Sequence, residues 1–376
     1  MRNREEDIGE GLRTVVGLMS GTSMDGIDAA LLRTDGRDRV EALSFLTIPY
    51  DDGFRARLRG GLGRVDNGGP VAEVGRELTD AHADAVRRLL DQAGVTPAEV
   101  ELIGFHGHTI HHDPDRRLTR QIGDGARLAA ATGIAVVNDF RSADVAAGGQ
   151  GAPLVPLFHR ALAHGLARPL AILNIGGVAN VSWIGPGTAD GPAEEAEVVA
   201  CDTGPGNALI DDWVLRHGLG RFDAGGALAA TGQVDDAALA ALMAHPWFHR
   251  PAPKSLDRDA FDPAPVAALS AADGAATLTA FTAESVARIL DHLPAPPVRW
   301  LVCGGGRHNA TLMAMLSARL GVPVESADLV GWDGDALEAQ AFGYLAVRSR
   351  LGLPLSLPAT TGVPAPQCGG VFHPAA

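Results

Sequence analysis

The chain lacks several features that mark familiar classes of protein. Its 376 residues include only 3 cysteines, Cys201, Cys303 and Cys368, too few and too scattered for a disulfide framework or a zinc cluster. No apolar run is long enough to cross a membrane, and the best candidate, residues 170–184, is short and interrupted by Asn and Gly. Residues 1–11 are polar and charged and lack the apolar core of a secretory signal. We therefore expect a protein of the reducing cytoplasm, without a membrane partner.

Positive charge is also scarce. Lys and Arg number 31 against 45 Asp and Glu, which gives a formal net charge of −14 at pH 7. A broad basic surface for nucleic acid is therefore not expected. The same charge opposes long-range attraction of a phosphate-bearing ligand, so local backbone amides and a divalent cation would have to bind it. No Gly-Lys-Ser/Thr sequence occurs, which argues against a P-loop.

One pattern occurs twice along the chain. It consists of an apolar strand, a glycine-containing turn and a second apolar strand, and it covers residues 14–32 and 170–184. This pattern predicts a β-hairpin rather than the strand-to-helix transition of a Rossmann sheet. The chain is also long enough for two domains. We predict a duplicated α/β architecture, with the crossing between domains in the Gly- and Pro-rich stretch 146–156.

The remaining elements follow from the spacing of apolar residues. Helices are predicted over residues 71–90, 127–132, 276–293 and 335–349, and from residue 309 onward. Residues 100–105 are predicted to form a buried strand that leads into a polar loop over residues 107–115. Four histidines, at 106, 108, 111 and 112, invite a metal-site interpretation. No further ligand at zinc-like spacing accompanies them, so we do not expect a metal there.

The turn of the first hairpin has the composition of a phosphate-binding loop. Gly21 and Gly26 let backbone amides approach phosphate oxygens without interference from a Cβ atom. The hydroxyls of Thr22 and Ser23 add further donors. An ordinary hairpin turn is the alternative interpretation, because glycine turns are common.

Two further glycine turns follow apolar strands, Gly176-Gly177 in the second hairpin and Gly304-Gly305-Gly306 after residues 298–302. The last of them opens a helix, whose amides and dipole favour an anion or a nucleotide edge. Each turn alone could be a helix cap or a point of tight packing. Together with the repeated hairpin, they indicate a cleft in which two similar domains hold one nucleotide. Asp25 and Asp28 are then candidates to hold Mg²⁺ through water.

Asp202 stands out between the second and third glycine turns. It precedes the rigid sequence Thr203-Gly204-Pro205-Gly206-Asn207, just ahead of a predicted helix. A carboxylate at this point suits a catalytic role. The alternative is that Asp202 caps the helix that begins near Leu209, an interaction worth about 1 kcal/mol.

A family resemblance now becomes visible. The segments that carry it are residues 17–28, His106-Gly107 with Thr109, residues 121–123, 139–156, 174–177, 202–207 and 303–306. Together they resemble the anhydro-N-acetylmuramic acid kinases, and the similarity runs in order from about residue 15 to the end of the chain. The stretch 139–156 is far more specific than any glycine turn.

The resemblance implies an actin/hexokinase/Hsp70-like fold of two ribonuclease H-like domains. The N-terminal domain would comprise residues 12–145 with about 351–376, and the C-terminal domain residues 146–350. Mg-ATP is implied as the phosphoryl donor, an amino sugar as the acceptor, and peptidoglycan recycling as the role. The resemblance also implies a homodimer.

Site residues follow by similarity. The nucleotide is assigned to Gly21, Thr22, Ser23, Met24, Asp25, Gly26, Ile27, Asp28, Asn174, Gly176, Gly177, Gly304, Gly305, Gly306 and Asn309. The amino sugar is assigned to His106, Thr109, Gln121, Arg141, Asp144, Gly206 and Asn207. Asp202 and Glu338 are the expected catalytic residues, although Glu338 equally suits a solvent-facing position on its helix.

Arg141 is the expected contact to the lactyl carboxylate of the sugar, because a guanidinium grips a carboxylate with two hydrogen bonds. An internal ion pair among Asp139, Arg141 and Asp144 is the alternative. The chain also departs from the family pattern at two places. His108 stands where the family commonly has Gln, and residues 254–259 are a varied form of a Lys-Ser-Thr-Gly-Arg-Glu pattern that keeps Lys254 and Arg258.

The implied substrate has a 1,6-anhydro bridge, so its O6 carries no proton for a base to remove. We hypothesise that Asp202 deprotonates a water that attacks C1, while O6 takes the γ-phosphoryl group; such a base contributes about 10²–10⁴-fold. Two other functions remain open. One is a kinase of the same fold for another sugar, and the other is a non-catalytic ATP-binding chaperone or filament module.

Overall fold

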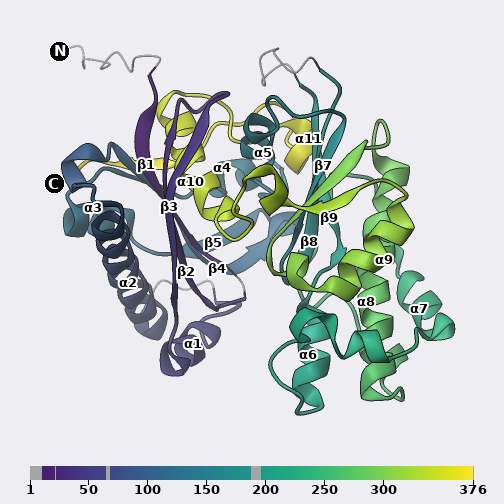
Figure 1. Cartoon of the computed structure of the whole chain (residues 1–376). Coiled ribbons are helices and arrows are strands. Elements are labelled where there is room, and N and C mark those ends of the chain that lie inside the picture. Colours follow the sequence, from purple (N-terminus) through teal and green to yellow (C-terminus); the bar gives the residue numbers. More distant parts are fainter. Residues whose placement is uncertain (1–10, 22, 65–67, 188–195, 376) are drawn as a thin grey trace.

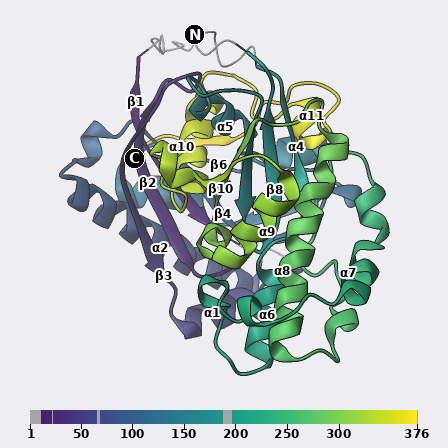
Figure 2. The ribbon, with the colours of Figure 1, turned by 45° about the vertical axis from the view of Figure 1, so that its right-hand side comes forward.

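The structure is a computed structural model that describes residues 11–21, 23–64, 68–187 and 196–375 (Figure 1). Thr22 and residues 1–10 of the charged N-terminal segment lie outside the described residues. Two β-sheets stand side by side, with helices between them and on their outer faces (Figures 1 and 2). None of the described helices is long and apolar enough to span a bilayer.

The first sheet is built on the predicted N-terminal hairpin. Its strands are β1 (Arg13–Ser20), β2 (Gly26–Thr34), β3 (Val40–Pro49), β4 (Leu102–Asp113), β5 (Leu118–Ile122), β6 (Val136–Asn138) and β12 (Val371–His373). Their order is β12-β6-β4-β1-β2-β3, with β5 paired to the end of β4. The strands β1, β2 and β3 are antiparallel, whereas β4 and β6 continue the sheet in parallel. The continuous apolar runs of β1 and β2 suit strands that are covered on both faces.

The prediction of a polar loop over residues 107–115 is wrong. Strand β4 continues to Asp113 and pairs antiparallel with β5, with Thr109 opposite Gln121 and His112 opposite Thr119. The polar side chains hid the strand because Ile110 is the single large apolar residue over 107–113, and most of this strand end is only partly buried. A polar strand needs a partner farther along the chain, and the local sequence does not name that partner.

The second sheet repeats the arrangement of the first. Its strands are β7 (Leu170–Ile175), β8 (Val178–Ile184), β9 (Val198–Pro205), β10 (Arg299–Cys303) and β11 (Val324–Ser326), in the order β11-β10-β7-β8-β9. Again a hairpin gains a third antiparallel strand on one side and two parallel strands on the other. The duplicated α/β fold predicted from the two hairpins is therefore confirmed.

Helices cover the sheets on both sides. They are α1 (Asp52–Arg59), α2 (Gly69–Ala93), α3 (Gly125–Thr132), α4 (Ser142–Ala146), α5 (Pro156–Leu162), α6 (Ala208–Arg216), α7 (Asp236–Met243), α8 (Ala271–Ala287), α9 (Ala310–Leu320), α10 (Leu337–Arg350) and α11 (Pro358–Thr361). Apolar residues of α2 pack on one face of the first sheet, and those of α8 and α9 pack on the second (Figure 2). The predicted long helices are thus confirmed.

Helix α10 lies between the two sheets and packs directly on β1 and β4. A Cβ atom added at Gly17 or at Gly104 would overlap the backbone of Ala339 or Phe342 on this helix. One hydrophobic cluster contains residues of α5, α10 and both sheets, so the core is continuous between the halves of the molecule. Helix α10 falls within the segment 146–350 that the sequence interpretation assigns to the C-terminal domain, yet its main contacts are with the first sheet. Helix α10 thus connects the two halves of the molecule, and the domain boundaries stay a prediction.

The contact between α10 and the first sheet leads to a stability prediction. We expect Gly104→Ala to lower the free energy of unfolding by about 1–3 kcal/mol, because the new methyl group has to displace helix backbone. Gly60→Ala is the matched control: Gly60 has a right-handed backbone and only ordinary contacts at the Cβ position. We expect it to change the free energy by less than about 1 kcal/mol. Urea unfolding of both variants measures the difference, and equal midpoints would refute the close packing.

Candidate active site

Two of the predicted glycine turns meet the segment that follows β9 at one end of the second sheet. Strand β10 lies beside β7 with Cys303 opposite Asn174, so the turn that begins at Gly304 lies next to the β7–β8 turn. The segment after β9 joins them: Gly206 N–H donates to Gly177 O at 2.9 Å, and Asn207 N–H donates to Gly176 O at 2.8 Å. Gly304 has a left-handed backbone with φ of 72°, and a Cβ atom there would overlap the Asn174 side chain. Glycine is thus required where the two turns touch.

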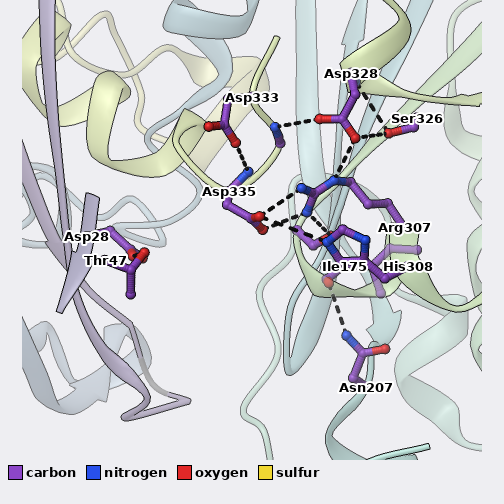
Figure 3. Close-up of polar contacts among 12 residues, drawn as sticks. Asp28, Thr47, Ile175, Asn207, Arg307, His308, Ser326, Asp328, Asp333 and Asp335 are labelled. Atoms are coloured by element: carbon purple, nitrogen blue, oxygen red, sulfur yellow. Dashed lines mark hydrogen bonds and ion pairs between the residues drawn. The ribbon is translucent and has the colours of Figure 1, made fainter. Parts of the chain in front are cut away.

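The structure gives two of the predicted binding residues another immediate partner: Asn309, assigned to the nucleotide, and Asn207, assigned to the sugar. Asn309 accepts a hydrogen bond from Leu312 N–H at 2.9 Å and so caps α9. Asn207 Nδ2 donates to Ile175 O at 3.2 Å (Figure 3). The side chains of Met24 and Ile27 lie in the apolar core. The backbone of Met24 is also engaged, because its N–H donates to Gly21 O at 3.0 Å and its O accepts from Arg55 Nε at 3.0 Å.

The two predicted Mg²⁺ residues lie in different surroundings. Asp28 accepts a hydrogen bond from Thr47 Oγ1 at 2.6 Å, and burial, with the charges of Glu338 and Asp335, raises its pKa to about 6. Figure 3 shows Asp28 on the first sheet and Asp335 on the other half of the molecule. Asp25 is exposed and pairs with Arg221 at 3.8 Å.

The donor set limits how a magnesium ion could be held. Within the residues that the structure describes, no three His, Cys, Asp or Glu side chains converge as metal ligands. Mg²⁺ in phosphoryl-transfer sites keeps several waters and uses one or two carboxylates together with the substrate phosphates. The single carboxylate of Asp28 fits such an arrangement.

Asp202 lies within β9 and does not cap α6. That helix begins at Ala208, after an Asn207 cap residue that makes no side-chain cap hydrogen bond. Asp202 is only 8% exposed, and its Oδ2 accepts a hydrogen bond from Leu256 N–H at 2.7 Å. Its own N–H donates to Lys254 O at 2.9 Å. Burial raises the pKa of Asp202 to about 7, against the opposing effects of the Leu256 hydrogen bond and of the Arg141 and Lys254 charges.

Residues 254–256 thus fix Asp202 at two points: Lys254 O accepts from its backbone N–H, and Leu256 N–H donates to its carboxylate. Sequence reasoning noted Lys254 only as part of a varied motif and did not connect it with Asp202. The Lys254 ammonium lies 4.1 Å from the centre of the Trp247 ring, which accounts for its burial. Nothing in the sequence spacing pairs residue 202 with residue 254, because the pairing depends on the fold.

Glu338 is partly buried near the start of α10, and the solvent-facing alternative does not hold. Its Oε1 accepts a hydrogen bond from Asn174 Nδ2 at 3.0 Å. Burial raises the pKa of Glu338, while the positive charge of Arg141 and the bond from Asn174 act in the opposite direction. Asn174 therefore serves as a link between the second sheet and α10.

Arg141 is the cation at the centre of these carboxylates. Burial lowers its pKa, whereas the charges of Glu338, Asp144 and Asp202 raise it. Its Nε donates to His106 Nε2 at 3.0 Å, and its NH1 donates to Gly151 O at 2.6 Å. An acceptor Nε2 means that His106 is neutral and carries its proton on Nδ1, which donates to Gly107 O at 3.0 Å. Burial and Arg141 hold the pKa of His106 well below its usual range.

Asp144 has three partners, and none of them is Arg141. Its carboxylate accepts from Gly151 N–H at 2.6 Å, from Thr361 Oγ1 at 2.6 Å and from Ser356 Oγ. Arg141 and Asp144 thus hold the carbonyl and the amide of the same residue, Gly151. This arrangement fixes the loop after α4 against the C-terminal segment.

The remaining predicted sugar residues form a separate hydrogen-bonded group on β4 and β5. Gln121 Nε2 donates to Thr109 Oγ1 at 3.2 Å and to Thr119 Oγ1 at 2.9 Å. His112 Nδ1 lies 3.0 Å from the same Thr119 hydroxyl. The sequence analysis noted His112 only as one of four histidines and did not single out Thr119, because it did not predict the pairing of β4 with β5. Residues 108–112 are His-Thr-Ile-His-His, which lack the apolar alternation that marks a strand.

The buried carboxylate of Asp202 gives a stability prediction. Its folded-state pKa lies above the ordinary value of 3.8, so ionised Asp202 destabilises the fold above about pH 7, and the cost vanishes as both states become protonated below pH 3.8. We expect Asp202→Asn to raise the free energy of unfolding at pH 8 by about 1–3 kcal/mol, and by less at pH 5. Asp80→Asn is the control of opposite sign, because its pairing with Arg127 lowers the Asp80 pKa. Urea titrations at both pH values decide; a destabilised Asp202→Asn protein at pH 8 would contradict the prediction.

Comparison with known proteins shows to which family the chain belongs. The family model described as anhydro-N-acetylmuramic acid kinase matches residues 13–375. A relative of that name from Rhodospirillum rubrum is 60% identical and covers 99% of this chain and 96% of its own; one from Acidiphilium cryptum is 57% identical and covers 94% and 96%. Among solved structures, gluconate kinase from Lactobacillus acidophilus is similar at a TM-score of 0.45 and 11% identity, covering 96% of this chain and 94% of its own. The chain belongs to the anhydro-N-acetylmuramic acid kinase family.

Proposed function

We propose that this protein is an ATP-dependent kinase that opens the 1,6-anhydro ring of anhydro-N-acetylmuramic acid with water and phosphorylates O6. The products would be N-acetylmuramic acid 6-phosphate and ADP, and the role would be peptidoglycan recycling in the cytoplasm. Family membership over nearly the whole chain supports the substrate. The observation that carries the mechanism is the buried Asp202 carboxylate, whose pKa of about 7 suits a general base.

The geometry at Asp202 supports a role in activating water. Leu256 N–H holds Oδ2, which leaves Oδ1 to accept a proton from a water molecule at C1 of the sugar. Water attack at C1 breaks the C1–O6 bond, and O6 then takes the γ-phosphoryl group of ATP. Glu338, held by Asn174, would lie close to the sugar as the second acidic group. Most of the remaining acceleration would come from in-line positioning of the reactants.

Arg141 is the proposed contact to the lactyl carboxylate of the sugar. With Nε on His106 and NH1 on Gly151, its NH2 is left to donate to a substrate. His106 uses both ring nitrogens within the protein, so we propose that it orients Arg141 and does not itself bind sugar. In the same way Asp144 would position the Gly151 loop. Thr109 and Gln121 remain the proposed hydroxyl contacts, and Gly206 and Asn207 remain proposed backbone contacts.

ATP would be held by the glycine turns from both halves of the chain. These are the turn of residues 21–26, Gly176-Gly177 and Gly304-Gly305-Gly306, whose glycines would let phosphate oxygens and the nucleoside come close to the backbone. Asp28 would hold Mg²⁺ through water, and the ion, when bound, would neutralise charge on the phosphates. A homodimer is the assembly that we propose for the protein in solution, and light scattering after gel filtration tests it.

The reaction itself can be tested with labelled water. We expect ADP release from ATP and Mg²⁺ to depend on anhydro-N-acetylmuramic acid, because the sugar completes the site. In ¹⁸O-water, mass spectrometry should find one heavy oxygen on C1 of a 6-phosphorylated product. Turnover of a plain hexose without turnover of the anhydro sugar would instead indicate a kinase for another sugar. ATP binding without sugar-dependent ADP release would indicate a non-catalytic module.

The role of Asp202 makes a separate prediction. Asp202→Asn should lower kcat by about 10²–10⁴-fold, because the amide cannot take a proton from water. In the unsubstituted protein, kcat/KM should rise with pH through about 7, since the base acts only when it is ionised. Asp84→Asn, an exposed change at the Arg87 ion pair on α2, serves as the control and should leave kcat unchanged. Near-normal turnover by Asp202→Asn would remove this residue from catalysis.

A further inference from the structure

Arg307 is a nearly buried arginine that follows the third glycine turn. Its side chain is 5% exposed, although its two acidic partners are each 50% exposed. NH1 and NH2 donate to the two carboxylate oxygens of Asp335 at 2.6 and 2.8 Å, and Nε donates to Asp328 at 3.1 Å (Figure 3). A two-bond contact between a guanidinium and a carboxylate fixes both the distance and the plane of the pair. Arg307 therefore orients Asp335 more strictly than a lysine could.

The same guanidinium is bound to the glycine turn. NH1 also donates to Gly304 O at 3.1 Å, and Gly304 N–H donates to Gly334 O at 3.2 Å. Gly334 lies against the Arg307 side chain so closely that a Cβ atom there would overlap it. The loop before α10 is thus tied to the turn after β10 through backbone and side chain together.

These contacts are part of a closed ring of contacts that includes Glu338. Asp335 lies three residues before Glu338, which accepts the hydrogen bond from Asn174. Asn174 lies opposite Cys303 in the sheet and touches the Cβ position of Gly304. The ring therefore runs from Gly304 through Arg307, Asp335 and Glu338 to Asn174 and back to Gly304. Glu338 is therefore connected to the turn on two sides, directly through Asn174 and through the chain from Asp335 to Arg307.

Charge gives the ring a second property. Arg307 lowers the pKa of Asp335, and the hydrogen bonds from Ser326 and Gly334, together with Arg307, lower that of Asp328, so both carboxylates stay ionised beside the proposed site for an anionic ligand. Without the guanidinium, two uncompensated negative charges would lie next to the glycine turn. Repulsion between them would push the loop that carries Asp335 away from Asp328, and α10 begins only two residues after Asp335.

We propose that Arg307 is a positioning residue that sets the Glu338 carboxylate relative to the nucleotide turn at Gly304. The proposal rests on the function proposed above, in which Glu338 takes part in the reaction. Arg307 itself touches neither the sugar nor the reacting oxygens. Its effect on turnover passes through Glu338, which distinguishes it from an arginine that merely stabilises the fold.

A double-mutant cycle tests this route. The variants are Arg307→Met, Glu338→Gln and the combination of both, measured as full-length proteins with ATP, Mg²⁺ and anhydro-N-acetylmuramic acid. We expect Arg307→Met to lower kcat by about 10–100-fold, because a misplaced group costs factors of this size. In the Glu338→Gln background the same change should alter kcat by less than about threefold. Arg307→Lys should recover part of the loss, since it keeps the charge without the two-bond geometry.

Arg299→Met is the matched control. It breaks the Arg299–Glu325 pair at the other end of β10, so its effect on kcat should be the same with and without Glu338. If Arg307→Met fails to fold, Asp335→Asn takes its place in the cycle. If Glu338→Gln lowers kcat and adding Arg307→Met lowers it again by the same factor as in the unsubstituted protein, this proposal is wrong while the role of Glu338 stands. Normal turnover by Glu338→Gln would overturn both the role of Glu338 and the proposal.

Discussion

The contact between α10 and the first sheet is the constraint on which the site depends. The helix approaches β1 and β4 so closely that glycine is required at positions 17 and 104. Because its backbone cannot shift toward the sheet, the beginning of α10 is set within a narrow range. Glu338 lies at that beginning, and Asn174 reaches it from the other sheet. One helix thus determines how the two halves of the molecule meet at the proposed reaction centre.

Electrostatics then divides the acidic residues near the site into two groups. Asp202, Glu338 and Asp28 have raised pKa values because burial disfavours their charged forms. Asp335 has a lowered pKa because Arg307 pairs with it, and Asp328 because Ser326, Gly334 and Arg307 all donate to it. Proton transfer near neutral pH needs groups of the first kind, and a rigid frame needs groups of the second kind. The net charge of −14 therefore does not predict the pKa values in the site, because the pKa of each carboxylate depends on its own neighbours.

Local patterns were sufficient to predict the architecture and the glycine turns. Each hairpin is contiguous in sequence, so its two apolar strands and its turn could be recognised together, and the second copy indicated the duplication. The family resemblance added the residues whose roles no local pattern reveals, such as Glu338. Several contacts remained out of reach because they join distant parts of the chain. His106 binds Arg141, Asp144 binds residues 356 and 361, and Lys254 lies beside Asp202. The strand over 107–113 was missed for a different reason: its partner β5 is close in sequence, but its side chains are mostly polar and show no apolar pattern.

The partners of Asp144 have a consequence for the order in which the molecule is completed. Two of its three hydrogen bonds come from Ser356 and Thr361, more than two hundred residues later in the chain. Ribosomes release a protein from its N-terminal end, so the Gly151 loop emerges long before the segment that anchors it. A nascent chain can form both hairpins and still lack the contacts that hold Arg141 and Gly151 in place. The proposed sugar contact at Arg141 would therefore be fixed only near the end of synthesis, once residues 356 and 361 have emerged.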